Sequence, residues 1–256
     1  CGLDEIEGYK DHWLQFIDTD KISIPSDDVS MTVRMKWEIE DTQGAATTNV
    51  SEGWIDGWDA VNVRISTDGG STWEILIGDD PYDFYSGYGW VYNGEKSGEN
   101  GTHSLASGWS GSKDWHLVSF DLNSYTGQDV IIRFAFGSDP AYSTWSDNGS
   151  KDGDPLPELT GVFIDDIIVA SSDSVLFNAD NEDEQNDILT TSSFSWTFQE
   201  SYESCISNGY YLDTIFSSLE QYCRYFYLFI DYNSKWCFDD ANENYILDVG
   251  ESEIPA

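Results

Sequence analysis

An unbroken alternation of apolar and polar residues over positions 29–39 is the feature that most constrains the fold. The stretch reads VSMTVRMKWEI, and every second side chain is apolar: Val29, Met31, Val33, Met35, Trp37 and Ile39. This period of two predicts a β-strand with one buried face, because successive side chains of a strand point to opposite sides. The chain therefore needs a sheet that covers a core.

More strand-like segments follow, separated by long loops rich in Gly, Ser and Asp. They lie at 60–66, 71–77, 115–122, 128–139 and 161–170. We expect no amphipathic helix before residue 200. Many strands with turn-rich connections are typical of sandwiches and jelly rolls. The sequence therefore predicts an all-β fold, an antiparallel jelly-roll sandwich.

The segment ISTDGGSTWEIL, at 65–76, contains the pattern S-x-D-G-x-x-T-W, which resembles the Asp box of sialidases. A sialidase propeller would repeat the box in each blade and would need clustered arginines. This chain has one copy and four arginines, three of them mid-strand: Arg34, Arg64 and Arg133. We expect the box to be a hairpin turn in which Asp68 caps backbone amides, glycines permit positive φ, and Trp73 packs beneath.

The composition changes near residue 172, and we place a domain boundary there. The predicted domains are a sandwich at 1–171 and a small Cys-containing extension at 172–256, which opens with an acidic loop at 177–187. Apolar residues between Leu212 and Phe226 follow helical spacing, which predicts one helix. The run at 225–230 could equally form a buried strand.

The four cysteines are Cys1, Cys205, Cys223 and Cys237, and no C-x-x-C pair occurs among them. A thiolate zinc site is therefore not expected. An even count in an acidic, aromatic-rich chain predicts a secreted or cell-surface protein with up to two disulfides, whose pairing the sequence leaves open. A chain that opens on Cys-Gly fits a processed protein and also matches the start of a bacterial lipoprotein.

The charge balance is extreme, with 48 acidic residues against 11 Lys and Arg and a net charge of −37. Phosphate binding needs clustered basic side chains, so a nucleic-acid partner is not expected, nor is an anionic membrane surface. No apolar run is long enough for a transmembrane segment. Repulsion of this size opposes a compact state unless cations or salt screen it.

The sharpest metal-binding motif is DANENYILDVGE, at 240–251. Six residues occupy positions 1, 3, 5, 7, 9 and 12 of an EF-hand-type calcium loop: Asp240, Asn242, Asn244, Ile246, Asp248 and Glu251. Such spacing supplies the six to eight oxygens that calcium takes. Tyr245 stands where these loops have Gly, so the motif resembles an isolated, dockerin-like loop. The alternative is an acidic turn without metal.

Three parts of the chain, 61–76, 114–139 and 161–169, together resemble the jelly-roll modules of secreted bacterial proteins. These are MAM-like, concanavalin-like domains found beside immune-inhibitor-A-type metallopeptidases. The opening GYKDHWLQFIDTDKISIP, at 8–25, resembles the first strands of such modules. The resemblance covers roughly residues 8–170 and is fairly specific for the fold but poorly specific for function.

The resemblance also implies a calcium ligand on the final strand of the module. An Asp at this place commonly helps to bind a structural calcium, which suggests Asp166 of the Asp165-Asp166 pair, with Asp139 as a partner. Two carboxylates on an apolar strand cannot both be buried without partners. The alternative is that they are capped by backbone amides or paired with Arg.

Loops at 51–58, 81–92 and 106–115 combine aromatic residues with Gly. Exposed rings on such loops suit stacking against sugars or contact with another protein. The candidate ligand-binding residues are Trp54, Trp58, Tyr85, Trp90 and Trp109. The alternative is that these rings cover the ends of the sheets.

No catalytic constellation stands out. H-E-x-x-H is absent, the three His are scattered, and among 48 acids any chosen carboxylate pair is uninformative. We therefore predict a non-catalytic, calcium-stabilised extracellular binding or adhesion module, with a glycan or a protein surface as partner. Two alternatives stay open: a self-associating structural subunit of an extracellular filament or surface layer, and an accessory domain of a secreted hydrolase.

Overall fold

The structure of the chain is a computed structural model. It describes residues 2–3, 6–25, 28–42, 45, 56–91, 93–98, 101–139, 141–144, 158–179, 188–195, 236–238 and 253–255. The chain divides into two compact units, one of residues 1–45 and 50–195 and the other of residues 46–49 and 196–256.

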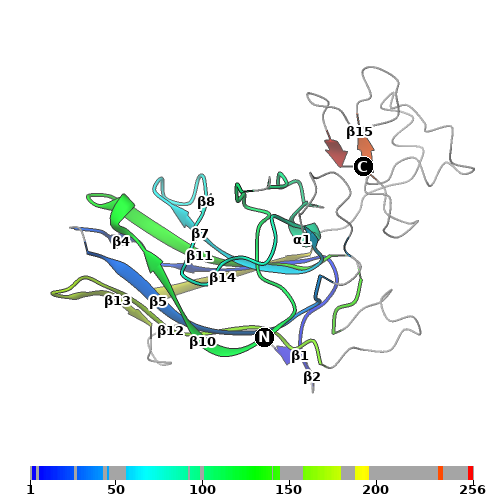
Figure 1. Ribbon diagram of the computed structural model, residues 1–256, viewed down its shortest axis with the longest axis horizontal. Helices are drawn as coiled ribbons and strands as arrows, with labels where there is room; N and C mark the ends of the chain where they lie inside the picture. Colours follow the sequence, from blue (N-terminus) through cyan, green and yellow to red (C-terminus); the bar gives the residue numbers. More distant parts are fainter. Residues whose placement is uncertain are drawn as a thin grey trace, which may run out of the picture. The chain divides into compact units, whose positions relative to one another are not determined.

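The first unit contains two antiparallel sheets that face each other (Figure 1). The four-stranded sheet has the order β10 (Ser112–Asp121), β5 (Ser30–Glu38), β12 (Gly161–Ala170) and β13 (Val175–Ala179). The six-stranded sheet has the order β14 (Leu189–Ser195), β3 (Trp13–Thr19), β11 (Asp129–Gly137), β7 (Ala60–Ser66) and β8 (Glu74–Ile75), and β4 (Ile22–Ser23) pairs with β11.

The chain changes sheet repeatedly, from β5 to β7, from β8 to β10, from β10 to β11 and from β11 to β12. The predicted all-β jelly-roll sandwich is thereby confirmed. The other elements are short: β1 (Gly2–Leu3), β2 (Ile6–Glu7), β6 (Asp56–Gly57), β9 (Ser86–Gly87), α1 (Tyr88–Val91), the 3-10 turn η1 (Asn123–Tyr125), β15 (Trp236–Phe238) and β16 (Glu253–Pro255). No helix in the described part of the chain is long and apolar enough to cross a membrane.

The core lies between the two sheets and follows the predicted alternation. All six apolar side chains of 29–39 are at most 2% exposed. They pack with inward residues of the facing sheet, among them Val63, Ile132 and Phe134. Burial of each such side chain contributes roughly 1.5–3 kcal/mol. This gain determines which face of β5 is turned toward the core.

The predicted turn at 65–76 is confirmed in detail. The Asp68 carboxylate accepts the Thr72 amide at 2.9 Å and the Thr72 hydroxyl at 2.7 Å. Gly69 and Gly70 have φ of 73° and 89°, which a side chain would disfavour. Trp73 lies against the Arg133 guanidinium, 3.9 Å from the ring centroid. The box is a turn that joins β7 to β8.

The sandwich extends further along the chain than the predicted boundary. β13 pairs with β12, and β14 pairs with β3. The first compact unit therefore runs to Ser195, whereas we placed the end of the sandwich at residue 171. The helix expected between Leu212 and Phe226 and the side chains of the four cysteines lie outside the described residues.

Candidate metal centre and binding surfaces

Three carboxylates lie at the ends of strands, at one end of the sandwich. Glu40 lies just after β5, Asp59 directly before β7, and Asp139 just after β11. The last pair in the ladder between β11 and β7 joins Gly137 to Ala60. This antiparallel pairing brings the end of β11 beside the start of β7, and so Asp139 beside Asp59.

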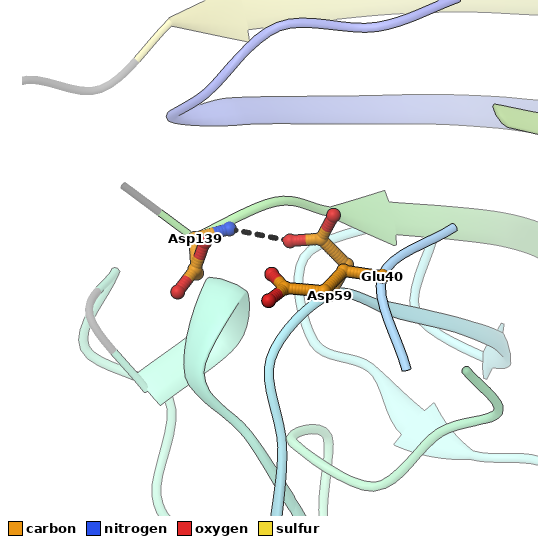
Figure 2. A group of neighbouring side chains, drawn as sticks. All are labelled: Glu40, Asp59 and Asp139. Atoms are coloured by element: carbon orange, nitrogen blue, oxygen red, sulfur yellow. Dashed lines mark hydrogen bonds between the residues drawn. The ribbon is translucent and has the colours of Figure 1, made fainter. Parts of the chain in front are cut away.

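The three side chains converge on one point (Figure 2). One carboxylate oxygen from each lies within 4.8 Å of the others. Asp59 is 0% exposed and Asp139 is 2% exposed. The Asp139 amide donates to Oδ1 of Asp59 at 2.8 Å, and this hydrogen bond fixes the relative positions of the two residues.

The N-terminal segment closes the site through Tyr9, which is also buried. Its hydroxyl donates to Oδ2 of Asp59 at 2.5 Å and accepts the Glu40 amide at 3.1 Å. The Ala141 amide donates to Oδ1 of Asp139 at 2.9 Å. Within the described residues, Oε2 of Glu40 is buried and has no hydrogen-bond donor. The site therefore has more acceptor oxygens than donors.

Burial and mutual repulsion shift the acid strength of these groups. Burial raises the pKa of Glu40 well above its usual range, and the charges of Asp139 and Asp59 raise it further. Burial also raises the pKa of Asp59, although hydrogen bonds from Tyr9 and the Asp139 amide act in the opposite direction. Three ionised carboxylates cannot stay this close without compensation. Protonation or a bound cation would relieve this repulsion.

The donor set suits a hard cation. All three groups offer carboxylate oxygens, and oxygen ligands are what calcium and magnesium prefer. Calcium tolerates irregular geometry and completes its shell with carbonyls and water. Glu40, Asp59 and Asp139 are therefore the residues that could hold calcium.

The structure separates the two ligands that the resemblance implied. Asp139 lies in the carboxylate cluster, whereas Asp166 lies mid-strand in β12 of the other sheet. Oδ2 of Asp166 lies 3.6 Å from the Arg34 guanidinium, beside a bulge between Asp165 and Ile168 that interrupts the alternation. This ion pair matches the alternative stated above. A metal role of Asp166 stays a prediction.

Glu40 and Asp59 were missed by sequence reasoning. Each is a carboxylate directly outside an alternating run in the sequence. This position indicates a site only when the strand pairing is known. The six loop residues Asp240, Asn242, Asn244, Ile246, Asp248 and Glu251 lie outside the described residues. The calcium loop at 240–251 stays a prediction.

The candidate ligand-binding rings require a correction. Trp90 and Trp109 are each 1% exposed, so they belong to the protein interior and a ligand cannot stack on them. Trp109 stacks on Trp37 at a centroid distance of 5.3 Å, and Trp90 lies 4.2 Å from the Arg64 guanidinium. Trp109 belongs to the hydrophobic core, and Trp90 packs over Arg64 of β7, so the Gly-rich loops do not expose either ring.

The other candidate rings are partly accessible or outside the described residues. Trp58 is half-buried against Tyr88, and Tyr85 is half-buried in a stack with His103 at 4.7 Å. Trp54 lies outside the described residues. Both described residues stay candidates for ligand contact.

An exposed ring that was not among the candidates lies on the outer face of the four-stranded sheet. Trp115 of β10 is 40% exposed and faces Phe163 of β12 at a centroid distance of 6.5 Å. Arg34 lies 5.5 Å from the Trp115 ring, and Lys36 lies 5.9 Å from the Phe163 ring. We call these four residues the outer aromatic face.

No protein-family model matches the chain, and a search of curated proteins finds no significant match. The resemblance to MAM-like modules therefore stays a prediction.

Proposed function

We propose that this protein is a non-catalytic, calcium-stabilised extracellular module that binds a glycan or a protein surface. The observation that carries the proposal is the cluster of half-buried Glu40 with buried Asp59 and Asp139 at one end of the sandwich. A buried carboxylate cluster opposes folding when it is ionised and empty, and it favours folding when a cation binds only the folded chain.

The position of the cluster explains what a bound ion would stabilise. Its ligands come from the ends of β5, β7 and β11, which belong to both sheets. Tyr9 contacts the same site, and the His12 amide donates to the Asp139 carbonyl at 2.9 Å. An ion here would tie the N-terminal segment and both sheets together, so metal binding and folding would be coupled.

The outer aromatic face supports the binding part of the proposal. Trp115 offers a ring to solvent, and the polar ends of Arg34 and Lys36 flank the two rings. Rings with adjacent hydrogen-bond donors suit contact with sugar hydroxyls or with a protein surface. This face is where we expect ligand contact on the sandwich.

Thermal unfolding with calcium and with chelator tests the proposal. Saturating calcium should raise the melting temperature by about 5–10 °C, since a ligand at about 100 times its Kd adds about 2.7 kcal/mol. Asp59→Asn and Glu40→Gln should remove the part of this gain that comes from the cluster, and a gain as large as that of the parent would overturn the assignment of calcium to it. Asp20→Asn, which removes an exposed carboxylate, is the matched control and should keep the whole gain.

Two further results would overturn the metal assignment. One is a melting temperature that is the same in calcium and in chelator. The other is an equal loss of the calcium effect in Asp20→Asn, because that result would assign the effect to the overall charge.

A further inference from the structure

A second site lies on the sandwich, distinct from the carboxylate cluster. It is a groove of about 460 Å³ between the start of β5, the end of β10 and the loop after β8. Its apolar lining comes from Val29, Ile77 and Phe120, and its acidic lining comes from Asp28, Asp79 and Asp121. We call it the acidic groove.

The walls of the acidic groove are held by hydrogen bonds to the backbone. The Asp79 amide donates to the Ser119 carbonyl at 2.9 Å, and Oδ1 of Asp79 accepts the Ser119 amide at 2.8 Å. A side chain at Gly78 would come within 2.9 Å of the Phe120 ring, so the loop backbone lies directly against β10. On the other wall, Oδ1 of Asn123 accepts the amides of Asp28 and Val29 at 2.6 and 3.0 Å. The groove is therefore preformed.

In the described part of the chain, no basic side chain pairs with the carboxylates of the acidic groove. Within the described residues, no ion pair joins Asp28, Asp79 or Asp121 to a basic side chain. The neighbouring Asp80, by contrast, is paired with Lys113 at 2.6 Å. Among the residues that the structure describes, no lysine, arginine or histidine lines the groove. The three carboxylates are exposed, so they are accessible to a charged partner.

We propose that the acidic groove binds a lysine- or arginine-bearing segment of a partner protein. Such a side chain combines an apolar stem with a cationic end. The stem can lie on Ile77, which is 46% exposed, while the cationic end reaches the carboxylates. The surrounding negative charge steers a basic segment towards the groove at low salt. A second copy of this chain is a poor occupant, because both copies carry −37.

This inference deepens the proposed function by naming a class of partner, and it rests on that proposal only in assuming a binding module. It does not depend on the cluster of Glu40, Asp59 and Asp139. If calcium does not raise the melting temperature of the parent but the parent binds the peptide, only the metal assignment is overturned. If calcium raises the melting temperature of the parent but the parent does not bind the peptide, only the proposal for the acidic groove is overturned.

The test is fluorescence anisotropy with a labelled short peptide of glycine and arginine, with the whole chain in saturating calcium. The triple variant Asp28→Asn, Asp79→Asn and Asp121→Asn should weaken binding by about tenfold, from three ion pairs of about 0.5 kcal/mol each. Asparagine keeps the Oδ1 acceptors of Asp79 and Asp121. The matched control is Asp20→Asn, Asp114→Asn and Asp173→Asn, which removes the same charge elsewhere and should bind within about twofold of the parent.

Ile77→Ser, which removes the exposed apolar contact without changing charge, should weaken binding about threefold. A peptide with citrulline in place of arginine should bind at least about tenfold more weakly, because it keeps the stem and loses the charge. Equal weakening in both triple variants, or displacement of the peptide by excess calcium, would overturn the proposal. The first result would indicate general attraction to an acidic surface, and the second would indicate a divalent ion as occupant.

Discussion

Asp56 shows what burial does to a single carboxylate. It is 1% exposed, and Oδ2 accepts the Tyr88 hydroxyl at 2.9 Å. Within the described residues, Oδ1 of Asp56 is buried without a hydrogen-bond donor. Burial raises the pKa of Asp56 from 3.8 to about 6, although the Tyr88 hydrogen bond acts to lower it. The ionised form is therefore costly in the folded chain.

This shift predicts a variant that is more stable than the parent at neutral pH. Between pH 3.8 and about 6 the folded chain binds more protons than the unfolded chain, so the contribution of Asp56 to stability falls as pH rises through that window. Asp56→Asn cannot ionise and keeps an acceptor for Tyr88. We expect its free energy of unfolding to exceed that of the parent by about 2–3 kcal/mol at about pH 7.5 and to match it near about pH 4.

The measurement is urea unfolding of both proteins at each pH in the presence of chelator, so that metal binding does not contribute. Asp20→Asn is again the control, because its carboxylate is exposed. A variant that is less stable than the parent at both pH values would show that the Asp56 carboxylate stabilises the fold.

Residues at the candidate site were only partly predictable. Asp139 was found through a resemblance, but Asp59 comes beside it only when β7 pairs with β11, and Glu40 follows β5 of the facing sheet. Asp166 was predicted as a partner of Asp139, yet it lies mid-strand in β12, where its carboxylate is 3.6 Å from Arg34. Strand alternation tells which face a residue occupies and does not tell which strands are neighbours.

At the scale of elements, alternation predicted β5, β7, β10 and β11 and one buried face of each, but not what covers the other face. It failed over 71–77, where β8 spans only Glu74–Ile75 and Ile77 is 46% exposed. β7 is buried on both sides. Its outward Asn62 donates to the carbonyls of Leu105 and Ser107 at 2.9 and 2.7 Å, and Arg64 donates to Glu95 at 3.0 Å. The loop that contributes these partners packs over polar residues of the strand. The local sequence of β7 does not predict that a distant loop covers this face.

The stability of the turn between β7 and β8 should depend on the Asp68 carboxylate. Asp68 accepts hydrogen bonds from the amide and hydroxyl of Thr72 and from the Ser66 hydroxyl, and these bonds hold its pKa at about 2. Asp68→Ala should lower the melting temperature by about 2–4 °C at neutral pH, because the carboxylate that accepts the Thr72 amide is lost. The stabilisation by this carboxylate is present above pH 3.8 and is lost as pH falls through about 2.

Asp68→Asn is the matched control for the turn. It keeps one oxygen acceptor for the Thr72 amide, so its melting temperature should lie between those of the parent and Asp68→Ala. Differential scanning calorimetry of the three proteins makes the comparison. An Asp68→Ala variant as stable as the parent would show that Gly69 and Gly70 alone define the turn.

At the scale of the whole molecule, the net charge of −37 opposes a compact chain. Ion pairs in the described residues compensate part of it, as in the two contacts of 2.7 Å between Arg133 and Asp18. With 11 basic residues in the chain, most of the 48 acids have no basic residue to pair with. The remaining repulsion acts between surface charges, and dissolved salt screens it over a Debye length of about 10 Å at 0.1 M and about 3 Å at 1 M.

Salt should therefore stabilise this chain independently of any specific metal site. In chelator, raising sodium chloride from about 0.1 M to about 1 M should raise the melting temperature by on the order of 5 °C. Asp59→Asn should respond equally, because screening acts on the surface and not on the buried cluster. Potassium chloride should have the same effect at equal ionic strength, since screening does not depend on the identity of the monovalent ion. A melting temperature that stays constant or falls with salt would show that surface repulsion does not limit the stability of the fold, and calcium would then act only through its ligands.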